Sequence, residues 1–217
     1  MTIPRLYVIV DDEAAAARGW TLGSLAAAYL EGGARLLQLR AKRLSSRELL
    51  ARAEELSTGA RPCEAGVIVN DRADVARLVR GAGVHVGQDD LPPARVREVV
   101  GADRVVGFST HTPAQIDAAL VEPISYLAVG PVFPTLTKAT GYDQVGLDLV
   151  RYAVAAAHAH AERTGASLIP VVAIGGITLD TARSVLDAGA ASVAVISDLL
   201  VGNSPADRVR AFLDRLA

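Results

Sequence analysis

The sequence contains a single cysteine, Cys63, among its 217 residues, and aromatic side chains make up only 4% of it. One cysteine cannot form a disulfide within the chain, and it excludes a zinc site built from several thiolates. No apolar run approaches the ~18 residues that a transmembrane helix needs. The amino terminus passes almost at once into a predicted strand, so we expect no signal peptide and a cytoplasmic location.

An excess of charge of one sign is also lacking. The chain has 22 basic and 24 acidic residues, which are interspersed and give a net charge of −2. Without a basic run, or basic residues alternating with aromatic ones, nucleic-acid binding is not expected. There is no G-x-G-x-x-G after an early strand and no P-loop motif, which argues against a nucleotide-binding fold of either kind.

What the sequence does contain is a regular alternation of two patterns. Eight short runs rich in Val, Ile and Leu each have the length of a strand that is buried on both faces. They are residues 6–10, 35–39, 66–69, 84–86, 104–108, 125–129, 169–174 and 192–196. Apolar residues at helical spacing predict helices over 21–32, 46–58, 72–80, 92–100, 114–120, 147–164, 180–188 and 206–216.

Eight repeats of strand and helix predict an α/β fold with a closed parallel sheet, that is, a single-domain (β/α)8 TIM barrel over residues 1–217. In such a barrel the active site lies where the strands end. Polar residues follow each predicted strand at that side, whereas the other side has glycines and ordinary helix ends. We therefore expect function at the carboxyl-terminal rim.

Three side chains at the second predicted strand suit an anion. Gln38, Arg40 and Lys42 alternate with apolar residues, so at strand spacing they point the same way. Two cations and an amide at a barrel mouth are suited to phosphate or diphosphate. An arginine that continues a barrel strand is costly unless it is paired, whereas Lys42 could also simply begin a solvated loop with Arg43.

Hard oxygen ligands follow the next two strands. Asn70, Asp71 and Asp90 would suit Mg²⁺, which binds one or two carboxylates, keeps waters and accepts phosphate oxygens of the substrate. The residues alone leave a second interpretation open. Asp71 has the position of a helix N-cap, and Asp90 precedes a helix that begins with two prolines.

Later loops suit a second anion. Gly175-Gly176 and Ile196-Ser197 follow the seventh and eighth strands, where many barrels bind phosphate through backbone N–H groups. The loop "GPVFPTLTKATG" after the sixth strand adds two hydroxyls and an ammonium, from Thr135, Thr137 and Lys138. The sequence thus predicts a site for two anionic groups, while His85, inside a strand, is expected to be packed rather than catalytic.

Seven motifs, in this order, resemble the thiamine-phosphate synthase family: "QLRAK", "VNDRADVA", "GVHVGQDDL", "GFSTHT", "GPVFPTLTK", "AIGGI" and "VAVIS". The resemblance covers the chain from Leu6 onward. It implies a (β/α)8 barrel that joins 4-amino-5-hydroxymethyl-2-methylpyrimidine diphosphate to 4-methyl-5-(2-phosphoethyl)thiazole, with Mg²⁺, and releases pyrophosphate. It also implies that the bond to diphosphate breaks first and that the thiazole nitrogen captures the resulting cation.

The same resemblance implies roles for individual residues. Those expected to act on the pyrimidine diphosphate are Gln38, Arg40, Lys42, Asn70, Ser109 and, as the diphosphate leaves, Lys138. Arg40, Lys42, Ser109 and Lys138 are the expected catalytic set, and Asp71 and Asp90 the expected Mg²⁺ ligands. The thiazole phosphate would be held by Thr135, Thr137, Gly176, Ile196 and Ser197.

Two alternatives accompany this interpretation. A thiazole tautomerase of the same fold would use His111 as its acid and base, and a regulator would bind thiamine phosphate without catalysis. Retention of Asp71, Asp90 and the cationic set favours the synthase over both. The low net charge and apolar helices permit a homodimer without requiring one.

Overall fold

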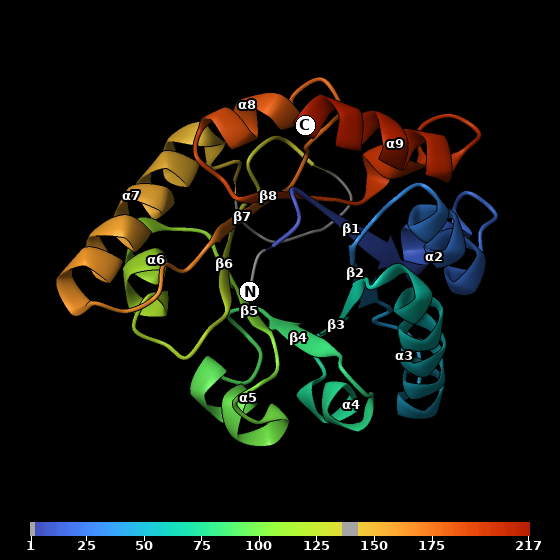
Figure 1. Ribbon diagram of the computed structural model, residues 1–217, viewed down its shortest axis with the longest axis horizontal. Coiled ribbons are helices and arrows are strands. Elements are labelled where there is room, and N and C mark those ends of the chain that lie inside the picture. The colour runs from blue at the N-terminus through green and yellow to red at the C-terminus, as the bar shows by residue number, and fades with distance from the viewer. Residues whose placement is uncertain (1–2, 136–142) are drawn as a thin grey trace.

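The computed structural model describes residues 3–135 and 143–217, and the structural statements below refer to these ranges. Within them eight parallel strands close into a barrel in the order β1 to β8, and β8 pairs back to β1. Figure 1 shows the ring of strands with the helices arranged around its outside. The predicted (β/α)8 barrel is therefore confirmed.

All eight predicted strands are present, and their ends differ from the prediction by at most two residues. The strands are β1 (Leu6–Asp11), β2 (Leu36–Arg40), β3 (Gly66–Asn70), β4 (Gly83–Val86), β5 (Val106–Thr110), β6 (Tyr126–Val129), β7 (Val171–Ile174) and β8 (Ser192–Val195).

The eight predicted helices are present as well, and the described residues form three further short helices that were not predicted. The predicted set is α2 (Leu22–Glu31), α3 (Ser46–Ala60), α4 (Ala73–Leu78), α5 (Pro93–Val100), α6 (Pro113–Ala119), α7 (Gly146–Thr164), α8 (Ala182–Asp187) and α9 (Pro205–Leu216). The additions are α1 (Asp12–Ala16), η1 (Arg61–Cys63) and η2 (Ser197–Leu200). They span three to five residues, too short to show a helical period in the sequence.

Side chains fix the starts of α2 and α3. Ser45 and Glu48 form a capping box at α3, in which the Ser45 hydroxyl accepts from the Glu48 N–H and the Glu48 carboxylate accepts from the Ser45 N–H. Thr21 and Ser24 form the corresponding pair at α2. These caps explain why both helices begin within one residue of the predicted positions.

The buried apolar side chains form two clusters that the sheet separates. The larger lies between the outer face of the strands and the helices and includes Val8 and Val10. The smaller fills the barrel interior and includes Tyr7, Ile9 and Tyr126. Alternate residues of β1 thus point to opposite faces, as the period of a strand requires.

Gly107 of β5 makes room in the barrel interior for the buried ring of Tyr126. A Cβ added at Gly107 would overlap Cζ and the hydroxyl oxygen of Tyr126, which is 0% exposed. We expect Gly107→Ala to lower the free energy of unfolding by about 3 kcal/mol, because overpacking a closed interior displaces its neighbours. Urea unfolding monitored by circular dichroism measures this change.

Gly59→Ala is the matched control for that substitution. A Cβ added at Gly59, within α3, has no atom within 4 Å. Alanine in a helix should stabilise the protein by about 0.5 kcal/mol. Equal unfolding midpoints for the two variants would contradict the packing described for β5.

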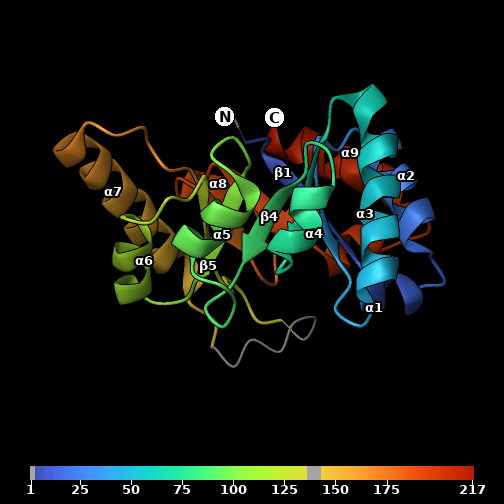
Figure 2. The ribbon, with the colours of Figure 1, turned by 90° about the horizontal axis from the view of Figure 1, so that it is seen from below.

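The two ends of the barrel differ in what they carry. The carboxyl terminus lies at the end where the strands begin (Figure 2), and there Arg5 Nη1, just before β1, donates to the carbonyl oxygen of Ala217 at 2.8 Å. The strands run away from this end, toward the opposite rim. No helix in residues 3–135 and 143–217 is long and apolar enough to cross a bilayer.

Candidate active site

The carboxyl-terminal rim brings together most of the predicted site residues that the structure describes. Gln38 and Arg40 belong to β2, Asn70 ends β3, and Ser109 belongs to β5. Side chains of all four line one small cavity inside the barrel mouth. Residues that are far apart in the sequence thus meet in one place, as the barrel topology predicts.

Arg40 is held by a buried carboxylate that the sequence analysis did not single out. Its guanidinium pairs with Oδ2 of Asp11, and the two side chains are only 11% and 1% exposed. The other oxygen of Asp11 accepts from the Ala14 N–H at 2.8 Å and so caps α1. A buried charge needs such a partner. The strand register places Asp11 directly beside Arg40.

The same guanidinium keeps one donor for a ligand. Nε of Arg40 is buried and has no hydrogen-bond partner in the described part of the chain. Since buried N–H groups are nearly always satisfied in native proteins, this donor is suited to an anionic group that binds in the cavity.

Lys42 and Asp71 form an ion pair across the loops after β2 and β3. Lys42 Nζ lies 3.1 Å from Asp71 Oδ2, and the lysine is 51% exposed. Asp71 has a φ of 63°, and the N-cap position of α4 belongs to Arg72, with no capping side chain. The interpretation of Asp71 as a helix N-cap is therefore wrong. A left-handed non-glycine residue is uncommon, and such residues cluster at functional sites.

Asp90 closes the loop that follows β4. Its Oδ2 accepts from the Gly87 N–H at 2.8 Å, whereas the N-cap position of α5 is Pro92, so Asp90 does not cap that helix. Burial raises the pKa of Asp90; the Gly87 N–H opposes this shift, and the carboxylate of Asp71 adds to it.

Since Asp71 and Asp90 lie close enough for one carboxylate to raise the pKa of the other, a cation bound between them would be stabilised by both. In residues 3–135 and 143–217 there is no cluster of three or more His, Cys, Asp and Glu side chains arranged to hold a metal. Asp71 and Asp90 as a pair still fit Mg²⁺, because this ion takes one or two carboxylates and completes its shell with water and phosphate oxygens.

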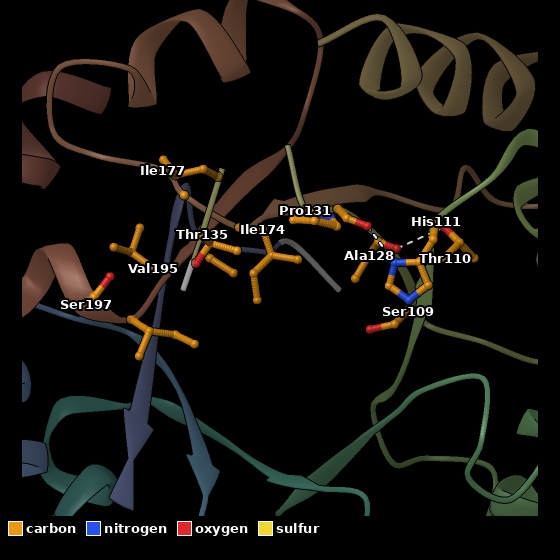
Figure 3. Close-up of a pocket in the computed structure, with 15 residues that line it drawn as sticks. Ser109, Thr110, His111, Ala128, Pro131, Thr135, Ile174, Ile177, Val195 and Ser197 are labelled. Atoms are coloured by element: carbon orange, nitrogen blue, oxygen red, sulfur yellow. Dashed lines mark hydrogen bonds between the residues drawn. The ribbon is translucent and has the colours of Figure 1, made fainter. Parts of the chain in front are cut away.

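A second cavity adjoins the first at the ends of β5 to β8 (Figure 3). The residues predicted to hold the thiazole phosphate that line this cavity are Thr135, Gly176, Ile196 and Ser197, and Ser109 lies in the walls of both cavities. In Figure 3, Ser197 and Thr135 lie on one side of this second cavity, and Ser109 and His111 lie on the other.

Gly176 is required where the loops after β6 and β7 pass one another. Its φ is 65°, and an added Cβ would come within 2.7 Å of the Phe133 carbonyl oxygen. The backbone therefore approaches more closely than any side chain would allow. Asp198 holds the neighbouring loops, since its Oδ2 accepts from the Leu179 N–H at 3.0 Å and from Arg208 Nη2 at 2.6 Å.

His111 is fixed against the backbone at the wall of this second cavity. Its Nδ1 lies 2.5 Å from the Gly130 carbonyl oxygen, which can only accept, so Nδ1 carries the proton. The peptide N–H of His111 donates to Gln115 Oε1 at 2.7 Å. Both contacts orient the imidazole ring beside Thr110 and Pro131.

Two of the predicted site residues, Thr137 and Lys138, lie outside the described residues, so their roles stay predictions. His85 is packed, as predicted, at 8% exposure, but it also joins Tyr7 and Tyr126 in a buried hydrogen-bond chain that the sequence analysis missed. The sequence signal that could have indicated this chain is a tyrosine at an inward-facing strand position.

Residues 6–199 match the family described as thiamine monophosphate synthase. The chain belongs to this family. The match spans all eight strands, and the predicted family resemblance is confirmed.

Relatives in the thiamine monophosphate synthase family are similar over the full length. The thiamine-phosphate synthase of Koribacter versatilis is 46% identical over 218 residues, which cover 100% of this chain and 97% of that protein. The thiamine-phosphate synthase of Acidothermus cellulolyticus is 40% identical, with 98% and 95% covered. The chain is thus assigned to a family of enzymes over its whole length.

A solved structure supports the same assignment. Thiamine phosphate pyrophosphorylase from Pyrococcus furiosus superimposes with a TM-score of 0.83 at 30% identity, and the alignment covers 98% of this chain and 95% of that one. A 3-hexulose-6-phosphate synthase superimposes with a TM-score of 0.64 at 15% identity, a likeness of fold alone.

Proposed function

We propose that this family member joins 4-amino-5-hydroxymethyl-2-methylpyrimidine diphosphate to 4-methyl-5-(2-phosphoethyl)thiazole, with release of pyrophosphate. The observation that carries the proposal is the pair of adjoining cavities at one rim. One is lined by Gln38, Arg40 and Asn70, the other by hydroxyl groups and glycine loops. Their common wall would bring two bound rings within reaction distance.

The first cavity would take the pyrimidine diphosphate. Arg40 in its wall and Lys42 in the loop after β2 would supply positive charge, and Gln38, Asn70 and Ser109 would supply polar groups for the ring and its substituents. When bound, Mg²⁺ at Asp71 and Asp90 would neutralise part of the diphosphate charge. Lys138 would add a further cation for the departing group.

The second cavity would take the thiazole phosphate. Thr135 and Ser197 would present hydroxyls to it, Gly176 lies close to the loop after β6, and Ile196 also lines the cavity. Thr137, outside the described residues, would act with Thr135. A dianionic phosphate is well matched to hydroxyl and backbone N–H donors of this kind.

The reaction needs no nucleophilic side chain. The C–O bond between the pyrimidine methylene and the diphosphate breaks, and its electron pair leaves on the diphosphate oxygen. The methylene cation is stabilised by the ring's amino group, and the lone pair of the thiazole nitrogen then forms the new C–N bond. Arg40 and Lys42 stabilise the charge that develops on the leaving oxygen, which is an electrostatic role.

Product analysis separates this proposal from the two alternatives. Purified protein with both substrates and Mg²⁺ should form thiamine phosphate, identified by chromatography and mass. A tautomerase would convert a thiazole precursor without joining it to the pyrimidine, and a regulator would bind thiamine phosphate without turnover. Either of those results in the absence of joining would refute the proposed function.

A further inference from the structure

Five buried side chains form a continuous hydrogen-bond chain across the barrel interior. Gln38 Nε2 donates to the Tyr7 hydroxyl at 2.7 Å, and the hydroxyls of Tyr7 and Tyr126 lie 3.1 Å apart. His85 continues the chain, with Nδ1 at 2.9 Å from the Tyr126 hydroxyl and Nε2 at 2.8 Å from Ser109 Oγ. The two ends of the chain, Gln38 and Ser109, line the first cavity.

The protons in this chain can be counted. Tyr7 is 1% exposed and Tyr126 0%, and their burial raises the pKa of both phenols, so each hydroxyl keeps its single proton. Because Tyr7 accepts from Gln38, its own proton must go to Tyr126, the remaining partner of its hydroxyl among the described residues. Leaving that proton unpaired in the interior would be unfavourable.

The same count fixes the rest of the chain. Tyr126 accepts from Tyr7, so it donates to Nδ1 of His85. The imidazole therefore carries its proton on Nε2 and donates to Ser109 Oγ. The Ser109 hydroxyl proton has no acceptor among the described residues and is available in the cavity, while Gln38 keeps its Oε1 as an acceptor.

With a neutral His85 imidazole, the chain has one other fully paired arrangement, in which every bond is reversed. Gln38 would then offer N–H groups to the cavity, and Ser109 would offer a lone pair. Because Tyr7, Tyr126 and a neutral His85 lie between them, Gln38 and Ser109 cannot change direction independently without leaving a buried group unpaired.

We propose that Tyr7, Tyr126 and His85 are positioning residues that make Gln38 an acceptor and Ser109 a donor toward the substrate. The inference rests on the proposed function and deepens it. It assigns the cavity to a heteroaromatic ring that presents an N–H to one end and a ring lone pair to the other. An aminopyrimidine presents this pattern, and the corresponding oxopyrimidine presents the opposite one.

Tyr126→Phe tests the proposal because it removes one hydroxyl and keeps the ring. The ring stacks on His85 at 5.6 Å between centroids and meets Tyr7 edge-on at 6.0 Å, so packing should be preserved. We expect KM for the pyrimidine diphosphate to rise about tenfold, as a broken buried network would cause, with KM for the thiazole phosphate unchanged.

Tyr29→Phe is the matched control. Tyr29 is also 0% exposed, and its hydroxyl has no hydrogen-bond partner in the part of the chain that the structure describes. Its replacement removes a buried phenol hydroxyl of the same kind without breaking a hydrogen bond of the chain. Both KM values should stay within about twofold of the unsubstituted protein.

Two unreactive inhibitors give a readout that a purely structural role would not move. In both, a carbon atom replaces the oxygen that links the pyrimidine methylene to the diphosphate, so the bond cannot break. One inhibitor has the ring amino group, and the other has an oxo group in its place. The unsubstituted protein should bind the amino compound about thirtyfold more tightly. In Tyr126→Phe, where the two ends can reorient separately, the preference should fall to about threefold or less.

An unchanged preference in Tyr126→Phe, in a protein that folds and turns over, would overturn the inference and leave the proposed function standing. Loss of preference in both Tyr126→Phe and Tyr29→Phe would also overturn it, since the effect would then not be specific to the chain. Failure of the unsubstituted protein to form product would instead refute the proposed function, so the two failures are distinguishable.

Discussion

Arg40→Ala should lower kcat/KM for the pyrimidine diphosphate by about a thousandfold. Arg40 is the most buried cation at the rim, its Nε has no partner in the described part of the chain, and it lies in the wall of the proposed diphosphate cavity. A donor that stabilises developing charge in a cavity closed to water contributes more than an exposed one does. Steady-state kinetics with the thiazole phosphate held at saturation measure the effect.

The stability of this variant needs its own control. Removing Arg40 leaves Asp11 buried without its partner, which is expected to cost about 3 kcal/mol. Adding Asp11→Asn removes that charge and keeps an oxygen to accept from the Ala14 N–H. The double variant should recover most of the stability and none of the activity. Recovery of activity together with stability would show that Arg40 is structural.

Asp90→Asn should change metal dependence and stability in opposite directions. Removal of one of two carboxylates is expected to raise the Mg²⁺ concentration for half-maximal activity at least about tenfold. Yet the metal-free variant should be no less stable than the unsubstituted protein, because an asparagine oxygen can still accept from the Gly87 N–H. If Asp90 were only a structural carboxylate, the variant would be less stable and its Mg²⁺ requirement would be unchanged.

The pKa direction gives the sign of this stability effect. Burial, with a further contribution from Asp71, raises the pKa of Asp90 in the folded protein, so the folded state takes up the proton more readily than the unfolded state does. Ionised Asp90 therefore destabilises the metal-free protein above that raised pKa. The advantage of Asp90→Asn should be present near neutral pH and disappear as the pH falls through the pKa.

Asp89→Asn is the neighbouring control, because Asp89 is exposed and adjacent in the same loop. It should change neither the Mg²⁺ titration nor the thermal midpoint in the absence of metal. If Asp90→Asn also left the Mg²⁺ titration unaltered, Asp90 would be a loop-closing residue and not a metal ligand.

The fold was predictable because its signals are local. Each strand is buried on both faces and appears as a short apolar run, and the long helices show their period, to which α2 and α3 add a capping residue, Thr21 or Ser45. α1 was missed because five residues cannot display a helical period, and its cap, Asp11, was not singled out in the sequence.

The sequence predicted which residues meet at the candidate site better than it predicted the contacts that they make with one another. Barrel topology predicts that residues after successive strands meet, which brings Gln38, Arg40 and Asn70 together. The pairing of Tyr7 with Tyr126 depends instead on closure of the sheet, since β1 and β6 face one another across the interior. No spacing in the sequence encodes a contact between residues separated by 119 positions.

Backbone geometry decided between the two interpretations of Asp71, as a helix N-cap or as a residue of the candidate site. Asp71 directly precedes the helix predicted over 72–80, and an N-cap was a reasonable interpretation of an aspartate there, but α4 begins at Ala73 and its N-cap is Arg72. The structure gives it a φ of 63° and an ion pair with Lys42, neither of which a sequence pattern shows. The site thus depends on a conformation that local propensity disfavours.

The most direct test of the account is pyrophosphate release by the purified protein, measured with both substrates together and with each alone, in the presence and absence of Mg²⁺. We expect rapid release only when the pyrimidine diphosphate and Mg²⁺ are present, with one thiamine phosphate formed for each pyrophosphate when the thiazole phosphate is added. Absence of Mg²⁺-dependent release, or release without any joined product in the presence of both substrates, would contradict it.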